Sequence, residues 1–220
     1  MKADLHVHSK YSKDALTSPR SFVKSAQKKG LQAIALTDHN TIKGWKPVLE
    51  AARGSSVQVI LGAEIKVLEN QKTSGEILGL FLNEAIASGP VEMVLDAIKQ
   101  QGGIAIIAHP FDGVRHSFKN LETIAKKVDA IEVLNARVFS EKANQKALAF
   151  AQKNELVGTA GSDAHTPIEI GRAFVESPAA NLEELQKNIR KGKIVVKGKR
   201  SSVWVHVCST LAKTRLLPSW

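Results

Sequence analysis

Three polar side chains alternate with apolar ones near the start of the sequence, in the stretch ADLHVHS. Asp4, His6 and His8 are separated by Leu5 and Val7. Alternate residues of an extended chain point to the same side, so two imidazoles and a carboxylate would project together from a first strand. Such groups bind divalent cations, whereas a polar face exposed to water is the alternative interpretation of so short a pattern. The pattern alone leaves both interpretations open.

Further histidines and carboxylates accompany later apolar runs, three of which end in TDHN, AHP and GSDAH, while two others contain GAEI and EILG. In a parallel α/β barrel the carboxyl ends of the strands meet at one face, where ligands bind, so these side chains would converge. One ion needs about four to six ligands, so the set predicts two or three ions that share a bridging carboxylate. Mixed nitrogen and oxygen ligands suit Zn²⁺, Mn²⁺ or Fe²⁺. The candidate ligands are His6, His8, Asp14, His39, Glu64, Glu76, His109, Asp163 and His165.

The rest of the chain predicts the elements that hold these side chains. Short runs of Val, Ile, Leu and Ala alternate with amphipathic stretches, which is typical of parallel strands joined by right-handed helical crossovers. About seven strands favour a closed or nearly closed barrel, so we expect a single α/β domain, a TIM-like (β/α)7 barrel over residues 1–200, with residues 201–220 as an extension packed on it. Expected strands span 2–8, 31–39, 57–68, 76–82, 103–110, 130–135 and 156–165, and expected helices span 18–30, 41–53, 90–101, 119–127, 140–154 and 181–191.

Composition indicates a globular chain with a local bias in charge. Of 220 residues, 43% are hydrophobic and 24% charged. No apolar run approaches the ~20 residues that span a bilayer, and the N-terminus lacks the zones of a secretion signal, so we expect a cytoplasmic protein without membrane contact. The single Cys208 excludes an internal disulfide and a thiolate zinc site.

The positive charge is concentrated near the C-terminus. Of the net charge of +10, residues 181–220 contribute +7, with nine Lys or Arg and two Glu. The run RKGKIVVKGKR in this segment could contact nucleic-acid phosphates, although such a run is more often a solvated face.

Taken in order, DLHVHS, TDHN, GAEI, AHP and GSDAH resemble the polymerase and histidinol phosphatase (PHP) superfamily of metal-dependent phosphoesterases. The resemblance covers nearly the whole chain and implies a distorted seven-stranded β/α barrel with two or three metal ions. Glu76 stands where many members have a histidine, so the second ion would gain a carboxylate, which favours Mn²⁺ over Zn²⁺. The resemblance implies three sets of ligands: His6, His8, Glu64 and Asp163 for one ion, Glu64 and His109 for a second, and Asp14, His39 and His165 for a third.

The chemistry implied by the resemblance is hydrolysis of a phosphate ester. A hydroxide that bridges two ions would attack phosphorus, because metal binding lowers the pKa of water from 15.7 to about 7. Glu64 and Asp163 would be catalytic because they hold those ions. An arginine at the rim would complete the charge stabilisation, and we expect Arg115 and Arg137 there, with Arg172 as a third candidate.

Four other polar residues have supporting or undecided roles. Asp4 is expected to accept the second hydrogen bond of one imidazole, and Asp38 to lie behind His39 as a supporting or capping group. His116 could act as general acid, as could a water molecule bound to metal. Otherwise His116 and His206 are interpreted as loop and surface residues.

Three functions fit these patterns. The first is a stand-alone phosphoesterase acting on a small phosphomonoester or a nucleotide phosphate. A 5′-directed exonuclease would use the basic segment to guide a strand, but single-strand binders interleave aromatics with basic residues, and this chain is only 5% aromatic. A non-catalytic metal-binding scaffold would have lost ligands, yet every motif position here can bind metal. The sequence therefore favours a small phosphorylated substrate and leaves its identity and the oligomeric state open.

Overall fold

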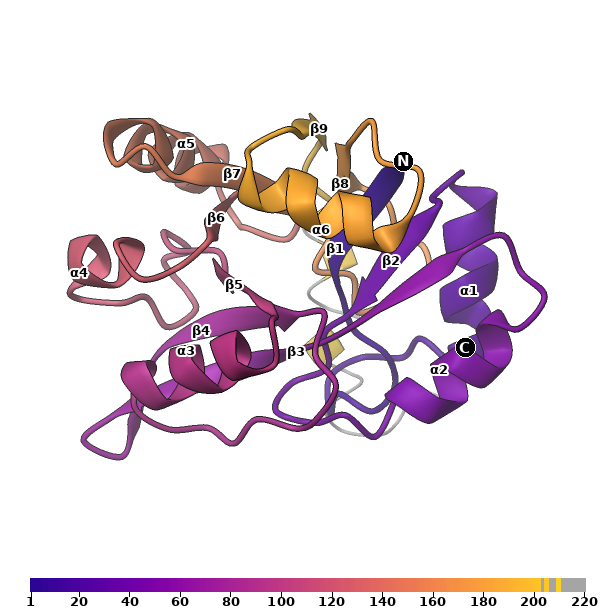
Figure 1. The fold of residues 1–220 in the computed structure, drawn as a ribbon, viewed down its shortest axis with the longest axis horizontal. Coiled ribbons are helices and arrows are strands. Elements are labelled where there is room, and N and C mark those ends of the chain that lie inside the picture. The colour runs from indigo at the N-terminus through magenta and orange to yellow at the C-terminus, as the bar shows by residue number, and fades with distance from the viewer. Residues whose placement is uncertain (203, 206–208, 211–220) are drawn as a thin grey trace.

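The computed structural model describes residues 1–202, 204–205 and 209–210, which form nine strands surrounded by six helices (Figure 1). The strands are β1 (Lys2–Val7), β2 (Ala33–Leu36), β3 (Gln58–Glu69), β4 (Lys72–Leu80), β5 (Ile104–Ile107), β6 (Ala130–Asn135), β7 (Val157–Gly161), β8 (Ala173–Glu176) and β9 (Val195–Gly198). The helices are α1 (Pro19–Lys28), α2 (Trp45–Ala52), α3 (Val91–Gln100), α4 (Leu121–Ala125), α5 (Glu141–Lys153) and α6 (Leu182–Arg190). All six predicted helices and all seven predicted strands are present.

The sheet bends round until its first and seventh strands meet. Its order is β7-β6-β5-β4-β3-β2-β1-β8-β9. Where β1 ends and just beyond β7, the His8 N–H donates to the Ala164 carbonyl at 2.9 Å and the Asp163 N–H donates to the His6 carbonyl at 2.7 Å. The expected α/β, TIM-like barrel in a single domain is therefore confirmed, as a nearly closed sheet.

The predicted number of strands is wrong, because β8 and β9 extend the sheet beyond β1. β8 runs antiparallel to β1, and β9 runs antiparallel to β8. Each has only four residues, and β9 is largely exposed within the segment that the sequence presents as a run of basic charge. Neither strand has the long apolar run that identified the other seven.

The expectation that all strands run parallel is also wrong, because β4 is antiparallel to both β3 and β5. β3 and β4 form a hairpin whose two turn residues, Asn70 and Gln71, have φ values of 50° and 65°. A turn of this kind usually carries glycine at its second position. Because Gln71 occupies that position here, the sequence gives no signal of the turn. The reversal brings the first half of β4, with Glu76, to the edge where the neighbouring parallel strands end.

Most strands are buried on both faces, which explains their apolar sequences. One apolar cluster joins the sheet to its covering helices and includes Phe22, Val48 and Ile98. A second cluster joins strand residues such as Leu5 and Ile106 to α6. These two clusters leave the carboxyl ends of the parallel strands for polar side chains.

The expected C-terminal extension, residues 201–220, lies mostly outside the described residues, as does His206. In its described part, the Ser201 N–H donates to the Ala136 carbonyl at 2.7 Å. Among the residues that the structure describes, no helix is long and apolar enough to cross a bilayer.

Candidate metal centre

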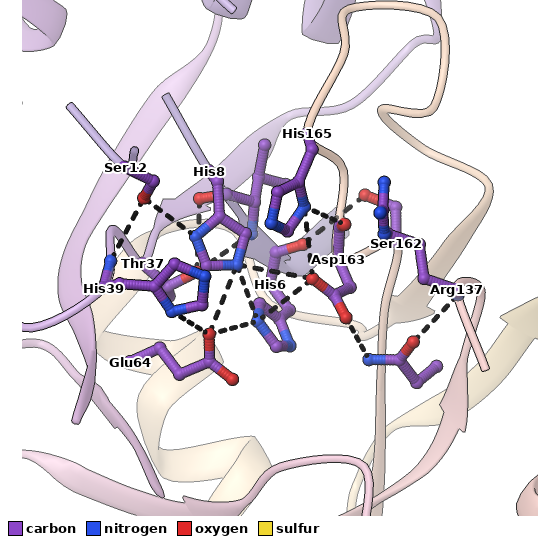
Figure 2. Close-up of polar contacts among 12 residues, drawn as sticks. His6, His8, Ser12, Thr37, His39, Glu64, Arg137, Ser162, Asp163 and His165 are labelled. Carbon is purple, nitrogen blue, oxygen red and sulfur yellow. Dashed lines mark hydrogen bonds and ion pairs between the residues drawn. The ribbon is translucent and has the colours of Figure 1, made fainter. Parts of the chain in front are cut away.

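Four predicted ligands form a buried group, which we call the inner set: His6, His8, Glu64 and Asp163 (Figure 2). The His6 and His8 Nε2 atoms are 3.1 Å apart. They lie 3.5 and 3.4 Å from Glu64 Oε2, and 3.6 and 3.3 Å from Asp163 Oδ1. Ligands held about 2.1 Å from a tetrahedral ion are about 3.4 Å from one another, so these atoms have the spacing of a tetrahedral metal site.

Both imidazoles of the inner set are oriented by a second hydrogen bond. The His6 Nδ1 lies 3.1 Å from Glu132 Oε1, and the His8 Nδ1 lies 3.1 Å from Ser12 Oγ. Because the Ser12 hydroxyl donates to Asp38 at 2.7 Å, it accepts from His8. Hydrogen therefore occupies the Nδ1 of His8, and with hydrogen on the Nδ1 of His6 as well, the neutral form of each ring would turn the lone pair of Nε2 toward the centre.

The electrostatic surroundings at the centre of the inner set favour a positive charge. Glu64 Oε2 and Asp163 Oδ1 are buried without a hydrogen bond among the described residues. Burial by itself would lower the pKa of His6, but the carboxylates of Asp163 and Glu64 raise it well above its usual value. The pull that keeps a proton on His6 would also hold a divalent cation, so the donor set fits such an ion.

A second set shares Glu64 with the inner set and adds His109 and Glu76. The His109 Nε2 lies 2.9 Å from Glu64 Oε1 and 3.6 Å from Glu76 Oε2. Burial and the neighbouring charge of Glu64 raise the pKa of Glu76. A cation between these groups would relieve the repulsion between the two carboxylates.

A third set consists of Asp14, His39 and His165. The Asp14 Oδ1 lies 3.5 Å from the Nε2 atoms of both histidines. The His39 Nδ1 also lies 2.9 Å from Glu64 Oε2, which connects this set to the others. Although burial favours the neutral ring, the carboxylates of Glu64 and Asp14 raise the pKa of His39 to about 9.

Two predicted ligands have a backbone conformation that residues other than glycine normally avoid. His109 has a φ of 27° and Asp163 a φ of 52°. Such a conformation costs on the order of 1–3 kcal/mol per residue and persists only where the surrounding structure enforces it. Its occurrence at two ligand positions is typical of a functional site.

The sequence matches the model of the PHP domain over residues 4–196. The chain belongs to the PHP domain family. An uncharacterized protein of Methanocaldococcus jannaschii is 36% identical over 191 residues, which cover 84% of this chain and 73% of that protein.

Solved structures share the PHP fold of this chain. PsfC from Pseudomonas syringae superposes with a TM-score of 0.70 at 20% identity and covers 98% of both chains. The lesion-specific endonuclease PfuEndoQ from Pyrococcus furiosus gives a TM-score of 0.67 at 20% identity, covering 89% of this chain and 57% of the endonuclease. These similarities support the barrel assignment independently of the motifs.

The PHP barrel brings all nine predicted ligands into three adjoining sets, but it separates the two predicted arginines. The Arg115 guanidinium contacts Asp163 and donates to Asp112 at 2.8 Å, with 26% of its side chain exposed beside the inner set. Arg137 is buried and donates to Glu169 and Ser209, at 2.8 Å each. Arg115 is thus the arginine placed next to the ligands.

Glu169 connects Arg137 to the third set. Its Oε2 accepts hydrogen bonds from the backbone N–H groups of His165 and Thr166, at 3.2 and 2.9 Å. Arg137 therefore braces the turn that presents His165.

One predicted supporting role is wrong and another is correct. Within the part of the chain that the structure describes, Asp4 accepts backbone N–H groups from Ser162, Gly171 and His6, and no imidazole hydrogen bond. Asp38 supports the PHP site as expected, through Ser12. His116 is exposed, in agreement with a loop residue.

Glu132 is not among the predicted residues, yet it takes the role expected of Asp4. It lies on β6 within AIEVLN, where the apolar pattern predicts the strand but assigns no role to its acid. A single carboxylate in a strand buried on both faces was the signal that could have identified it.

Proposed function

We propose that this chain is a metal-dependent phosphoesterase that hydrolyses a small phosphomonoester or a nucleotide phosphate. The observation that carries the proposal is the position of Glu64. Its Oε2 lies within 3.5 Å of His6, His8 and His39, and its Oε1 lies 2.9 Å from His109. One carboxylate thus joins all three sets, as the bridging ligand of a multi-ion phosphoesterase does.

Divalent ions held by these residues would neutralise phosphoryl oxygens and lower the pKa of a water molecule that attacks phosphorus. The chain itself supplies orientation. Glu64 and Asp163 fix the spacing of the centre. Arg115, whose guanidinium contacts Asp163 and Asp112, would offer a remaining N–H to a phosphate oxygen beside the centre. Asp14 and His39 form the more exposed side of the cluster, which suits substrate approach.

The nature of the donors favours two or three ions, with Mn²⁺ ahead of Zn²⁺ and Fe²⁺. The second set combines two carboxylates, Glu64 and Glu76, with the single imidazole of His109. Oxygen ligands shift the preference toward harder ions.

The proposal is tested by hydrolysis assays on protein loaded with Mn²⁺ or Zn²⁺. The panel contains phosphomonoesters, nucleotides, dinucleotides and 5′-phosphorylated oligonucleotides, with chelated protein as the control. We expect release of phosphate from a small monoester or nucleotide, and none from chelated protein. Preference for the oligonucleotide would support the 5′-directed exonuclease, whereas inactivity on the whole panel with ions bound would support the scaffold.

A further inference from the structure

Glu132 is a buried carboxylate that belongs to none of the three ligand sets. It lies in β6 with 1% of its surface exposed. Its Oε1 lies 3.1 Å from the His6 Nδ1, while its Oε2 accepts from the His109 backbone N–H at 2.9 Å and from the Asn135 side-chain amide at 2.8 Å. The His109 and Asn135 partners are donors, so Oε2 is an acceptor, and in the ionised carboxylate Oε1 is free to accept a hydrogen bond from the His6 Nδ1.

We infer that Glu132 is the positioning residue that makes His6 a metal ligand. A carboxylate on Nδ1 holds the ring with its hydrogen on that nitrogen, which leaves Nε2 to face the centre and makes Nε2 more basic. The inference rests on the metal centre of the proposed function, but it does not depend on any substrate.

The strand β7 packs closely against the His6–Glu132 pair at Gly161. A Cβ atom added to Gly161 would lie 2.3 Å from the His6 Cβ and 2.9 Å from Glu132 Oε1. Real Cβ contacts are never so short, so only glycine allows β7 to approach this closely. The ring and the carboxylate are thus confined between β1, β6 and β7.

Glu132 also connects the inner set to the second set. The His109 N–H that it accepts belongs to the residue with the unusual φ of 27°. The same carboxylate therefore orients one imidazole and helps to hold the backbone beneath another. Its loss should weaken ions in both sets.

Glu132→Gln removes this function while keeping the volume of the side chain. If the amide oxygen faces His6, the amide NH₂ meets the N–H donors of His109 and Asn135. If the amide is turned round, its NH₂ faces His6, so hydrogen must move to Nε2, where it blocks ligation. Either orientation opposes the arrangement that an ion requires.

The matched control is Asp4→Asn. Asp4 is a fully buried carboxylate on β1 that also accepts three N–H groups, all of them from the backbone. This variant makes the same chemical change two residues from His6 and leaves the partner of Nδ1 in place. A general effect of inserting a buried amide would appear in both variants.

The first measurement is the affinity of the tightest Zn²⁺ ion, by competition with a chromophoric chelator. We expect Glu132→Gln to bind it about 10- to 100-fold more weakly than the unmodified chain, and Asp4→Asn to stay within about threefold. Equal affinity of Glu132→Gln and the unmodified chain would overturn the inference.

The second measurement is the position of hydrogen on His6 in the unmodified Zn²⁺-loaded protein, by long-range ¹H–¹⁵N correlation. We expect hydrogen on Nδ1 and zinc on Nε2. Hydrogen on Nε2 would overturn the inference even if Glu132→Gln does not fold. Neither measurement involves a substrate, so a failure of the proposed hydrolysis would be seen separately.

Discussion

The inner set and the third set contain the same kinds of side chain but are held in different ways. Both inner imidazoles are fully buried, and each has its Nδ1 paired with a neighbouring side chain. In the third set, the side chains of Asp14 and His39 are 17% and 26% exposed. The inner ligands are therefore fixed before an ion binds, whereas water can take the place of a lost ligand in the third set. The difference predicts that an ion in the inner set would be held tightly and that an ion in the third set would exchange more readily.

Glu64→Gln should have the largest effect, because the Glu64 carboxylate belongs to the inner set and also lies 2.9 Å from His39 of the third set. Without its negative charge, this side chain would no longer balance the positive charge of more than one cation. It would also no longer set the distance between those cations. We expect kcat/KM to fall on the order of 10³-fold or more, at least ~4 kcal/mol of transition-state stabilisation. Glu69→Gln, an exposed change on the same strand, is the control. If Glu64→Gln kept more than about a tenth of the activity, the bridging assignment would be wrong.

The buried carboxylate of Asp4, two residues from His6, predicts that the stability of the fold depends on pH. Burial raises the pKa of Asp4 from 3.8 to about 6. Between these values the folded protein keeps a proton that the unfolded chain has released. The free energy of unfolding should therefore fall by about 3 kcal/mol from this group as pH rises through the window, at about 1.4 kcal/mol per pKa unit.

Denaturant titrations of chelated protein between pH ~4 and ~7 test this contribution to the free energy of unfolding, with Asp4→Asn as the reference. The carboxylates and histidines of the ligand sets titrate in both proteins, so their effects cancel in the difference. We expect the unmodified chain to lose stability relative to Asp4→Asn as pH rises. A difference that does not vary with pH would show that Asp4 is ionised in the folded state throughout this range.

His165→Ala should have a smaller effect, confined to the third set. As a proposed ligand, His165 would serve one ion, and water could partly replace it. At limiting metal we expect activity to fall about 10- to 100-fold, with much of the loss recovered in excess Mn²⁺. Elemental analysis should show fewer ions per chain, with the inner ion retained. Loss of all ions would show that the sets do not bind independently.

The smallest effect is expected from neutralising four exposed lysines of the basic segment. None of these lysines is a predicted ligand, so kcat/KM on a small monoester should stay within about threefold. The four residues are Lys191, Lys193, Lys197 and Lys199. Arg200 is kept, because it donates to the carbonyl groups of Val138 and Phe139. If an oligonucleotide is bound at all, its affinity and the salt dependence of binding should fall together. A large loss on the monoester would place these lysines at the active face.

The sequence predicted the elements and the ligand candidates well because both depend on short-range patterns. Apolar runs identified seven strands, and histidines and carboxylates at their ends identified the nine candidates. Strand direction was harder, because the reversal of β4 depends on a tight turn at Asn70 and Gln71 without glycine. Short strands such as β9 depend on their neighbours for pairing and have little pattern of their own.

The sequence also fails to predict which side chain supports His6. Asp4 and Glu132 are both acids on apolar strands, and Asp4 is the nearer in sequence to His6. Which of them meets the imidazole depends on how β1, β6 and β7 are placed across the barrel. That placement is a tertiary property, so spacing along β1 could not distinguish the two roles.

The meeting of β1 with the turn after β7 has a consequence for how the chain reaches its native state. Asp4 and Ser162, 158 positions apart, share a hydrogen bond, and the inner set takes ligands from the same two ends of the barrel. A bound ion would therefore act as a cross-link that closes a very long loop, a kind of constraint that acts on the unfolded chain. During synthesis this link cannot form until the segment around Asp163 has emerged. Metal uptake would then mark the point at which the barrel is complete.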